Sequence, residues 1–462
     1  MNDPASLQTV QDRLVAKRPR RPVTRPGTGR SGTGSFVDSM IAALVVLYLV
    51  AAAGATANLL TPVDPTGKML EGSGLLTISW LALYGISAPF IITSLRPSIT
   101  LREVVLFAFA GLAIAGVAWS KMPNATLMYG FSLIANLAFA WACHRHLSLE
   151  RFERILLFTL NALIVIGLLM AVVGLPHAYY FDPIDRANLL GTVLVRGLFS
   201  HKIYAGFYAA IAFAMNIQLL RNPWRWPMAA TCALAVLVSG SSLGLVTLLL
   251  VCVLMVLLPR LQDLQLRLLF LVMMLFGTVV ALLSWQTLFA DAVGALGRDV
   301  TLTGRTTLWA YAVQFWSEKP VLGWAYGGIF GDDPNAPGAI VNVDKYYQAP
   351  HFHDVYLQVA AEMGSVGFLL FSTILFMTIG TALRNTWTLR RPVDTVSAIF
   401  ALSLAVIGTV MNIGARYNEL STILLAYFFL ATGNGAGVWR ALPRPSSGRV
   451  RAGALQNRAS DR

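Results

Sequence analysis

A polar segment that runs directly into a long apolar stretch carries the side chains best suited to chemistry. It holds His351 and His353, and His353 begins the run His-Asp-Val-Tyr-Leu that leads on to Glu362. Imidazole is the side chain that most readily exchanges a proton near neutral pH. Ionisable groups are costly next to hydrocarbon, so their position beside an apolar stretch indicates a functional site. We therefore expect proton transfer or anion binding at this segment.

Basic side chains lie in the same polar parts of the chain. Arg196 opens the stretch Arg-Gly-Leu-Phe-Ser-His-Lys that contains His201 and Lys202, while Arg305 and Arg416 lie in two later segments. Arginine suits phosphate groups because its planar guanidinium makes paired, charge-assisted hydrogen bonds. These cations therefore predict an anionic ligand, with a diphosphate as the natural candidate.

The composition identifies the class of protein in which these residues must be positioned. Of 462 residues, 56% are hydrophobic and only 12% are charged, which excludes a soluble domain and predicts an integral membrane protein. The formal charge of +13 could suggest nucleic acid, but the basic residues lie mainly in the two tails and in short loops. That pattern reports membrane orientation, and we expect no nucleic-acid partner. The three cysteines are far apart, lack CxxC spacing and are interpreted as packing residues.

Apolar stretches near the roughly 20 residues that a helix needs to cross a bilayer predict an all-α polytopic fold with about twelve transmembrane helices. Between the seventh and eighth stretches, the Ser-Gly-Ser-Ser-Leu-Gly run at 239–244 is either a tight turn or a break in one re-entrant hairpin. The first stretch is interpreted as an uncleaved anchor, because a polar tail precedes it. The twelve stretches are approximately 36–59, 73–95, 102–119, 123–143, 154–174, 203–220, 226–240, 243–259, 267–290, 355–382, 394–414 and 418–435.

The basic tails fix the expected orientation. Residues 1–35 and 436–462 are both rich in arginine, and an even number of helices places them on one side, which we predict to be cytoplasmic. Both tails are expected to be disordered and to contact anionic lipids. Residues 36–435 then form the membrane domain, with loops 175–202 and 291–354 on the periplasmic face. The second loop is far longer than a simple connector, which indicates function.

Part of the long loop has the pattern of a helix. Between 306 and 316, apolar and aromatic residues recur at intervals of three and four, and Pro320 follows. We predict a helix that lies in the membrane interface. Arg305 would stand at its N-terminus, where free N–H groups and the helix dipole already favour an anion.

Simpler interpretations apply to each of these residues taken singly. An external Arg or Lys often only reaches toward lipid headgroups, and a lone His is often a hydrogen-bonded interface residue. Glu362 should lie inside the tenth stretch, where it is expected to be a buried structural partner rather than a catalytic acid. The sequence contains no HExxH, CxxC, Walker A or GxSxG motif and no convincing carboxylate cluster, so we expect neither a metal ion nor a cofactor.

Several short motifs occur in a fixed order, and together they carry a resemblance to a known family. They are 196–206 (RGLFSHKIYAG), the Ser-Gly-Ser-Ser turn at 239–242, Gly304-Arg305 with Leu308-Trp309, 320–323 (PVLG), and His353-x-x-Tyr356-Leu357 with Glu362-x-Gly364. In this order they resemble the O-antigen ligase and polymerase superfamily, over approximately residues 190–380. The RG-F-HK stretch is most similar to the exopolysaccharide polymerase branch, the ExoQ-like and Wzy-like proteins.

The sequence departs from the family pattern at two positions. Asp354 and Ile203 stand where the family usually has Asn after His and after His-Lys. We expect the Asp354 carboxylate to orient or charge-stabilise the imidazole of His353.

The resemblance implies a GT-C-like glycosyltransferase of the bacterial inner membrane that acts at the periplasmic face on glycans carried by undecaprenyl diphosphate. Its donor and acceptor would both be such lipid-linked glycans, and a flippase, a chain-length regulator and export proteins would be its partners. Single displacement would invert the anomeric centre. The diphosphate clamp would comprise Arg196, Arg305 and Arg416, with Lys202, and the catalytic pair would be His353 and Arg305. Supporting residues would be His201, His351, Asp354, Tyr356 and Glu362.

Three alternatives to a polymerase remain open at this point. A ligase would move finished glycan onto lipid A core or protein, and it differs only in its acceptor. A twelve-helix transporter or flippase would fit the topology, although the charged residues gather in outer loops rather than at mid-membrane, and no paired broken helices indicate an inverted repeat. A noncatalytic scaffold in an export complex would tolerate loss of His353.

Overall fold

A computed structural model describes residues 32–65, 68–69, 74–95, 97–182, 188, 190–261, 263–283, 305–331, 336–341 and 349–433. The chain divides into two units, Met1–Ala42 and Ala43–Arg462, and every contact discussed below lies within the second. Within the described residues the structure is helical, and its only β-type pairings are two isolated bridges. The basic tails at 1–31 and 434–462 and the part of the long loop at 291–304 lie outside the described residues.

Each of the twelve predicted stretches coincides with a helix. Six segments are long and apolar enough to cross a membrane, namely Gly74–Ile92, Leu101–Ala118, Pro123–His146, Leu149–Val172, Ser242–Arg260 and Val355–Thr388, while five apolar helices among the described residues are shorter. The prediction of an all-α membrane protein is therefore confirmed, and the crossing of all twelve stays a prediction. The helices are α2 (Gly32–Ala52), α4 (Gly74–Ile92), α5 (Leu101–Ala115), α6 (Pro123–His146), α7 (Leu149–Val172), α8 (Lys202–Leu219), α9 (Arg225–Ser239), α10 (Ser242–Leu257), α11 (Leu264–Leu283), α14 (Val355–Thr388), α15 (Pro392–Gly408) and α16 (Leu420–Gly433).

Capping residues set several helix boundaries. Thr100 and Glu103 form a capping box at the start of α5, and the Ser148 side chain accepts from the N–H of Arg151 at the start of α7. The run at 239–244 is a tight turn: Gly240 ends α9 with φ 60°, and Ser241 caps α10 by accepting from the N–H of Gly244. The tight turn and the two helices that it joins are confirmed, and the crossing of the membrane by each of them stays a prediction.

Helix α8 packs against both α9 and α10, and its contact with α10 depends on two glycines. A Cβ on Gly206 would lie 2.9 Å from the Cα of Gly244, and the reverse substitution would bring atoms to 2.7 Å. The motif at 196–206 and the Ser-Gly turn region thus meet at a close backbone crossing, which only glycines permit.

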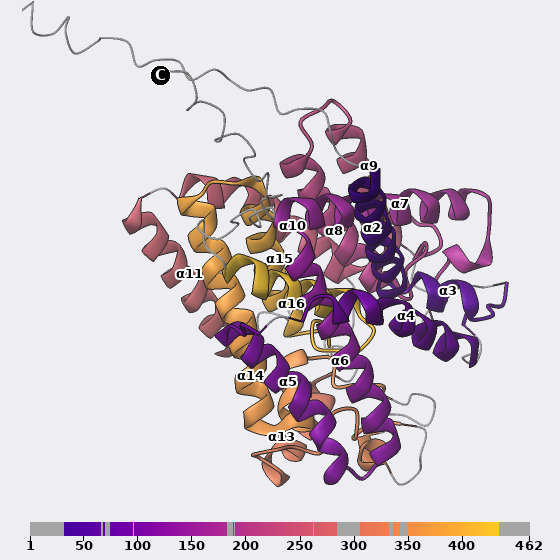
Figure 1. Cartoon of the computed structure of the whole chain (residues 1–462), viewed down its shortest axis with the longest axis vertical. Helices are drawn as coiled ribbons and strands as arrows, with labels where there is room; N and C mark the ends of the chain where they lie inside the picture. The colour runs from indigo at the N-terminus through magenta and orange to yellow at the C-terminus, as the bar shows by residue number, and fades with distance from the viewer. Residues whose placement is uncertain are drawn as a thin grey trace, which may run out of the picture. The chain divides into compact units, whose positions relative to one another are not determined.

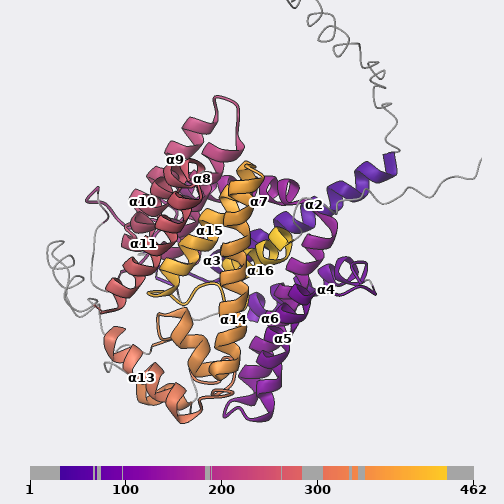
Figure 2. The ribbon, with the colours of Figure 1, turned by 90° about the vertical axis from the view of Figure 1, so that its left-hand side faces the viewer.

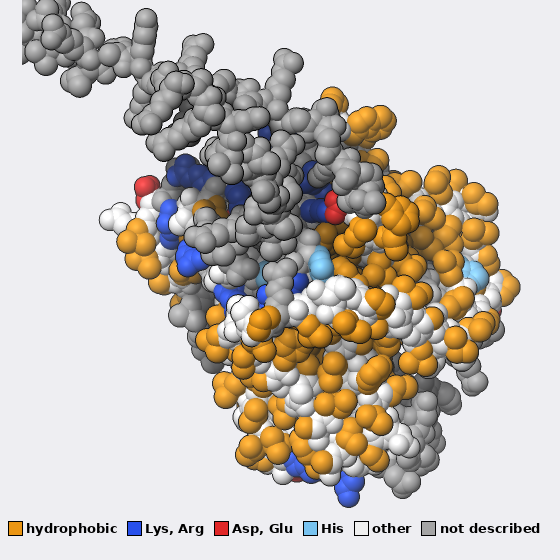
Figure 3. Space-filling view, viewed as in Figure 1, with side chains coloured by type: hydrophobic (Ala, Val, Ile, Leu, Met, Phe, Trp, Pro, Cys, Tyr) orange, Lys and Arg blue, Asp and Glu red, His pale blue; other side chains and the backbone are white. Residues whose placement is uncertain are grey.

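Helix α14 contacts α5, α15 and α16, and it is broken by a kink at Gly364, where φ is 63° and ψ is −168°. Figure 1 shows α14 beside α5, and Figure 2 shows it between α5 on one side and α13 (Arg305–Glu318) on the other. Figure 3 shows hydrophobic side chains over much of one face of the molecule, as expected for a surface that lipid covers, with basic side chains gathered above them and at the lower end.

Helix α13 confirms the predicted helix of the long loop, but its apolar face is covered by protein. Leu308, Ala312 and Phe315 are buried in a cluster with Ile329 and Phe352. The aromatic stripe therefore packs the loop onto the start of α14, and the predicted position in the membrane interface is not needed to explain it.

Candidate functional site

The N-terminus of α8 carries the first histidine of the site. His201 caps the helix, because its Nδ1 accepts from the N–H of Ile203 at 3.1 Å. The ring proton must then be on Nε2, which lies 2.8 Å from Oη of Tyr180 and donates to it. Burial, followed by the charge of Lys202, lowers the pKa of His201 to about 4, so the ring is neutral at physiological pH.

Lys202 lies beside this histidine, and its charge is already compensated. Its Nζ is 2.6 Å from Oδ2 of Asp182, both residues are buried, and the ammonium lies 5.0 Å from the centroid of the Tyr180 ring. A buried ion pair loses much stability if one member is removed. Lys202 therefore stabilises the start of α8, independently of any part that it has in ligand binding.

The turn that carries Arg196 is held in place by Asn58, a buried residue of the short helix α3 (Ala55–Leu60). Its side-chain amide donates to the carbonyl oxygens of Gly197 and Phe199, both at 2.9 Å. Arg196 is 2% exposed, and its Nε donates to the carbonyl oxygen of His177 at 3.2 Å. Its Nη2 is buried and has no hydrogen-bond partner among the described residues, so this cationic donor is unsatisfied within them.

The other two histidines of the site, His351 and His353, lie immediately before α14. Nδ1 of His351 accepts from the N–H of His353 at 3.1 Å, and the two rings lie 4.1 Å apart. His353 adopts a left-handed conformation with φ 56°, which is uncommon for a residue with a side chain and is often associated with function. Burial, followed by Arg305, His201 and Arg416, lowers the pKa of His353 to about 3.

Asp354 has a structural role at the start of α14, and its expected effect on His353 stays a prediction. Its Oδ1 accepts from the N–H of Leu357 at 2.9 Å and thereby caps α14. Asn caps a helix as well as Asp does, so Asp354 can cap α14 at a position where the similar family usually has Asn. Burial raises the pKa of Asp354 to about 7.

Arg416 lies between α15 and α16, close to all three histidines. Its charge, with that of Arg305, lowers the pKa of both His351 and His353, and it also lowers the pKa of His201. Burial alone would lower the pKa of Arg416, but Tyr204, Tyr417 and Glu419 raise it, so the guanidinium stays charged. Residues from four separate segments thus meet in one basic cluster.

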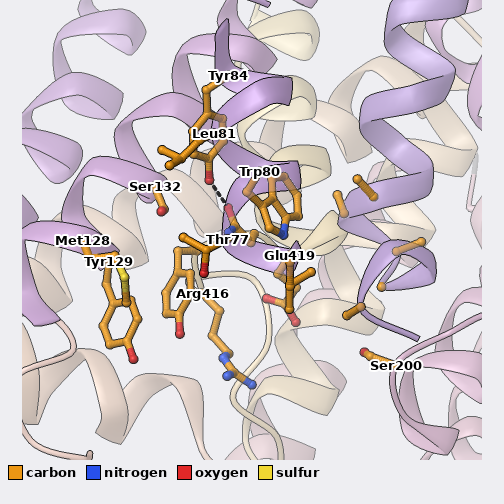
Figure 4. A pocket seen from close by; sticks show the side chains of 18 of the residues that line it. Thr77, Trp80, Leu81, Tyr84, Met128, Tyr129, Ser132, Ser200, Arg416 and Glu419 are labelled. Carbon is orange, nitrogen blue, oxygen red and sulfur yellow. Dashed lines mark hydrogen bonds between the residues drawn. The ribbon is translucent and has the colours of Figure 1, made fainter. Parts of the chain in front are cut away.

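Two cavities adjoin this cluster. The first, of about 380 Å³, is lined from α4 and α6 by side chains such as Leu76, Leu81, Met128 and Phe131 and reaches Arg416. Figure 4 shows Arg416 and Tyr84 toward opposite ends of this cavity. The lining side chains Leu81 and Phe131 are also exposed on the outer face of the helices, so the cavity borders the apolar surface.

The second cavity, of about 610 Å³, also reaches Arg416, and Glu362, Gln358 and Asn412 line it. Tyr129, Arg416 and Tyr417 line both cavities, so the two cavities meet at these residues. The two tyrosine rings are stacked, with centroids 4.2 Å apart and planes at 12°.

Two predicted supporting residues lie on α14. Oη of Tyr356 donates to the carbonyl oxygen of Ala405 at 2.9 Å, so this residue joins α14 to α15. The Glu362 carboxyl group accepts from Nε2 of Gln358 at 2.9 Å, and Oε1 of Gln358 accepts from the N–H of Phe352 at 2.8 Å. Glu362 is buried, as expected, but it also reaches the second cavity.

Sequence reasoning missed Asn58 and the pair Tyr129 and Tyr417. Each is a single polar or aromatic residue in or next to an apolar stretch, without a neighbouring motif. Their roles arise from contacts between distant segments, and no local pattern signals them. Among the described residues, no group of three or more His, Cys, Asp or Glu side chains is arranged to hold a metal ion.

Comparisons with known proteins agree with the motifs. Residues 227–372 match a family model described as O-antigen ligase. The exopolysaccharide production protein ExoQ of Rhizobium meliloti (strain 1021) is 25% identical over 317 residues, which cover 64% of this chain and 70% of the relative. The resemblance to the O-antigen ligase and polymerase superfamily is confirmed. The matched range of the family model includes Arg305, both histidines before α14 and Glu362, whereas Arg196 and Arg416 lie outside it.

Proposed function

We propose that this protein is a polysaccharide polymerase of the bacterial inner membrane, which joins oligosaccharide repeat units carried by undecaprenyl diphosphate. The observation that carries the proposal is a basic cluster at the meeting point of an apolar and a polar cavity, where Arg305 and Arg416 act on the neutral imidazole of His353 and Arg196 acts on that of His201. The similarity to an exopolysaccharide production protein supports this activity.

The donor is an amphiphile, and the site has matching parts. A prenyl chain fits the first cavity, because its lining is apolar and it borders the apolar surface. The diphosphate then reaches Arg416, and the buried free Nη2 of Arg196 offers it a further hydrogen bond. Fixed cations stabilise the negative charge that grows on a leaving diphosphate, which is the usual electrostatic contribution to such a reaction. The positive charge of Lys202 would also stabilise the diphosphate, although its ion pair with Asp182 partly neutralises that charge.

The proposed reaction is a single displacement. The oxygen of an acceptor sugar hydroxyl attacks the anomeric carbon, and the bond from that carbon to the diphosphate oxygen breaks, with its electron pair leaving on the diphosphate. The hydroxyl proton passes to His353 and from there to solvent. Attack from the face opposite the leaving group inverts the anomeric centre. The chain's own cations take the electrostatic role, so neither a metal ion nor a cofactor is needed.

The lowered pKa of His353 describes the site when no substrate is bound. Arg305 and Arg416 hold the imidazole neutral, which makes it a proton acceptor but a weak base. A bound diphosphate places negative charge beside the same arginines and offsets their effect, so the pKa of His353 rises toward its usual range. The substrate thereby strengthens its own base, and the buried neutral His351 and His201 support the arrangement.

A ligase is the second candidate, because the matching family model is described as O-antigen ligase. It would use the same donor and the same cluster, and it would transfer finished glycan to lipid A core or protein. Both proposals place the cluster at the periplasmic face, the two basic tails in the cytoplasm, and about twelve helices across the membrane in a GT-C-like fold. A flippase, a chain-length regulator and export proteins are proposed as partners.

The acceptor distinguishes the two candidates. Purified protein in nanodiscs would receive radiolabelled lipid-linked repeat unit alone, or together with lipid A core. Products longer than one repeat unit from the donor alone would support the polymerase. Transfer that requires lipid A core would identify a ligase, and absence of any new glycosidic bond with either acceptor would reject both.

A further inference from the structure

The cavity of about 610 Å³ contains polar groups that the proposed reaction does not use. Asn412, in the segment between α15 and α16, lines it and is only 5% exposed. Its side-chain amide makes no hydrogen bond to any described residue, whereas the amide nitrogens of Asn58 and Gln358, two other buried amides near the site, donate to backbone or side-chain oxygens. An amide that lines a cavity without a protein partner can bind a ligand there.

The remaining lining is of the kind that binds a sugar. The Glu362 carboxyl group accepts hydrogen bonds, and the Asn412 amide both donates and accepts them, which matches the hydroxyl groups of a saccharide. The stacked rings of Tyr129 and Tyr417 add a flat apolar wall with polar hydroxyl groups. A few convergent polar groups against an aromatic wall are typical of a small-molecule pocket of this size.

The position of the cavity indicates which saccharide enters it. Ala349 and Pro350, which directly precede His351, line this cavity, and Gln358 links Glu362 to the N–H of Phe352 in the same turn. The apolar cavity adjoins this one at Arg416 and the two tyrosines. A single displacement needs the attacking hydroxyl and the leaving diphosphate on opposite sides of the anomeric carbon. The cavity beside the histidine turn is therefore on the acceptor's side.

We propose that this cavity is the acceptor-saccharide site, where Asn412 and Glu362 bind hydroxyl groups of the acceptor sugar and the Tyr129–Tyr417 pair forms its aromatic wall. The inference rests on the proposed function, because it uses the direction of that reaction. Asn412 and Glu362 are specificity residues here and take no part in proton transfer.

Two-substrate kinetics test the assignment. For Asn412→Ala and Glu362→Gln we expect the acceptor KM to rise about tenfold, the effect of about 1.4 kcal/mol from one lost hydrogen bond, while the donor KM stays unchanged. Glu362→Gln retains an oxygen that can accept from Gln358, so the helix contact persists. Asn222→Ala, at an exposed asparagine in the connection between α8 and α9, is the matched control and should leave all these values unchanged.

A binding measurement separates this inference from the proposed function. The probe is a lipid-free oligosaccharide of one or two repeat units, prepared by partial hydrolysis of the host polysaccharide and followed by saturation-transfer NMR with protein in nanodiscs. Binding that is lost in Asn412→Ala and retained in Asn222→Ala supports the site. Equal binding by both variants, no binding by the wild type, or an unchanged acceptor KM overturns the inference even if polymer forms. Saccharide binding without any bond formation by the wild type rejects the proposed function and, with it, the acceptor role.

Discussion

The backbone N–H of Ser365 donates to the carbonyl oxygen of Pro320 at 2.8 Å, which joins the long loop to the kink of α14. The N–H of Val366 likewise donates to the carbonyl oxygen of Val321 at 3.2 Å, and that of Trp324 donates to the carbonyl oxygen of Ala361 at 3.0 Å. The motifs at 320–323 and at Glu362-x-Gly364 are therefore one structural unit. They hold the lower part of α14, with Glu362, against the loop that carries α13.

Two glycines make this contact possible. A Cβ on Gly364 would lie 2.2 Å from the carbonyl oxygen of Val321, and one on Gly323 would lie 2.5 Å from the backbone of Glu362, and both residues have positive φ. We predict that Gly364→Ala and Gly323→Ala each destabilise the protein by more than the roughly 1–2 kcal/mol that a left-handed conformation alone costs.

The control for this prediction is Gly380→Ala in the same helix, where a Cβ would meet nothing within 4 Å. That substitution should be neutral or stabilising by up to about 1 kcal/mol. Thermal unfolding in detergent, followed by the loss of soluble monodisperse protein, measures all three variants. Equal melting temperatures for Gly364→Ala and Gly380→Ala would contradict the described kink.

The N-cap at α14 yields a prediction about Asp354. Asp354→Asn preserves a side-chain acceptor for the N–H of Leu357, so polymer formation should stay within about twofold of wild type, whereas Asp354→Ala should lose about 1 kcal/mol of stability. Because burial raises the pKa of Asp354 to about 7, the carboxyl costs stability as the pH rises from about 4 to 7. Asp354→Asn removes this cost, so it should gain stability over wild type at pH 8 and not at pH 4. A large loss of activity in Asp354→Asn at unchanged stability would show that the carboxylate acts on His353 after all.

The ion pair at the start of α8 predicts the behaviour of Lys202. Lys202→Met leaves the Asp182 carboxylate buried without its cation, and we expect a loss of about 3–5 kcal/mol. Lys202→Met combined with Asp182→Asn removes both charges and should recover most of that stability. Melting temperatures of the two variants provide the test, and equal destabilisation would contradict a paired role. If the double variant is stable and still binds donor as wild type does, the charge of Lys202 contributes little to the diphosphate site.

The pH dependence of catalysis follows from the histidines. Because the pKa of His353 is lowered to about 3, kcat/KM for the donor should stay flat from pH 8 down to about pH 5, with no loss near 6.5. A bound diphosphate raises this pKa, so kcat should begin to fall at a higher pH than kcat/KM does. The folded state disfavours charged His201 and His353, so stability is lost as the pH falls below about 6.5, where the unfolded chain binds protons. An acidic limb of kcat/KM near pH 6.5 would contradict the described cluster.

The fold could be predicted from the sequence to the extent that apolar stretches determine it. Every one of the twelve stretches contains a helix, and the turn at Gly240 and Ser241 follows from the known conformations of those residue types. The stripe of α13 shows the limit of the same reasoning, because an apolar face packs equally well against lipid or protein. Its burial against Phe352 is decided by the tertiary contact with α14, which periodicity does not contain.

The site was predictable where residue type alone limits the options. Histidines and arginines in outer polar segments pointed to one cluster, and the charges of Arg305 and Arg416 on His353 are consistent with it. The roles of Asp354 and Lys202 were not accessible, since a carboxylate next to a histidine and an N-cap look alike in sequence, and the Asp182 partner lies 20 residues away. Tyr129 and Tyr417 lie far apart in the sequence, so only the fold brings their stacked rings together.

The central claim is that His353 accepts the proton in a metal-independent glycosyl transfer. The most direct measurement incubates purified protein in nanodiscs with its lipid-linked repeat unit, with and without EDTA, and compares wild type with His353→Ala of equal thermal stability for glycan products longer than one repeat. We predict elongation by the wild type that EDTA does not reduce, and a loss of at least about 100-fold in His353→Ala. Full elongation by His353→Ala, or elongation by the wild type that EDTA abolishes, would contradict the account.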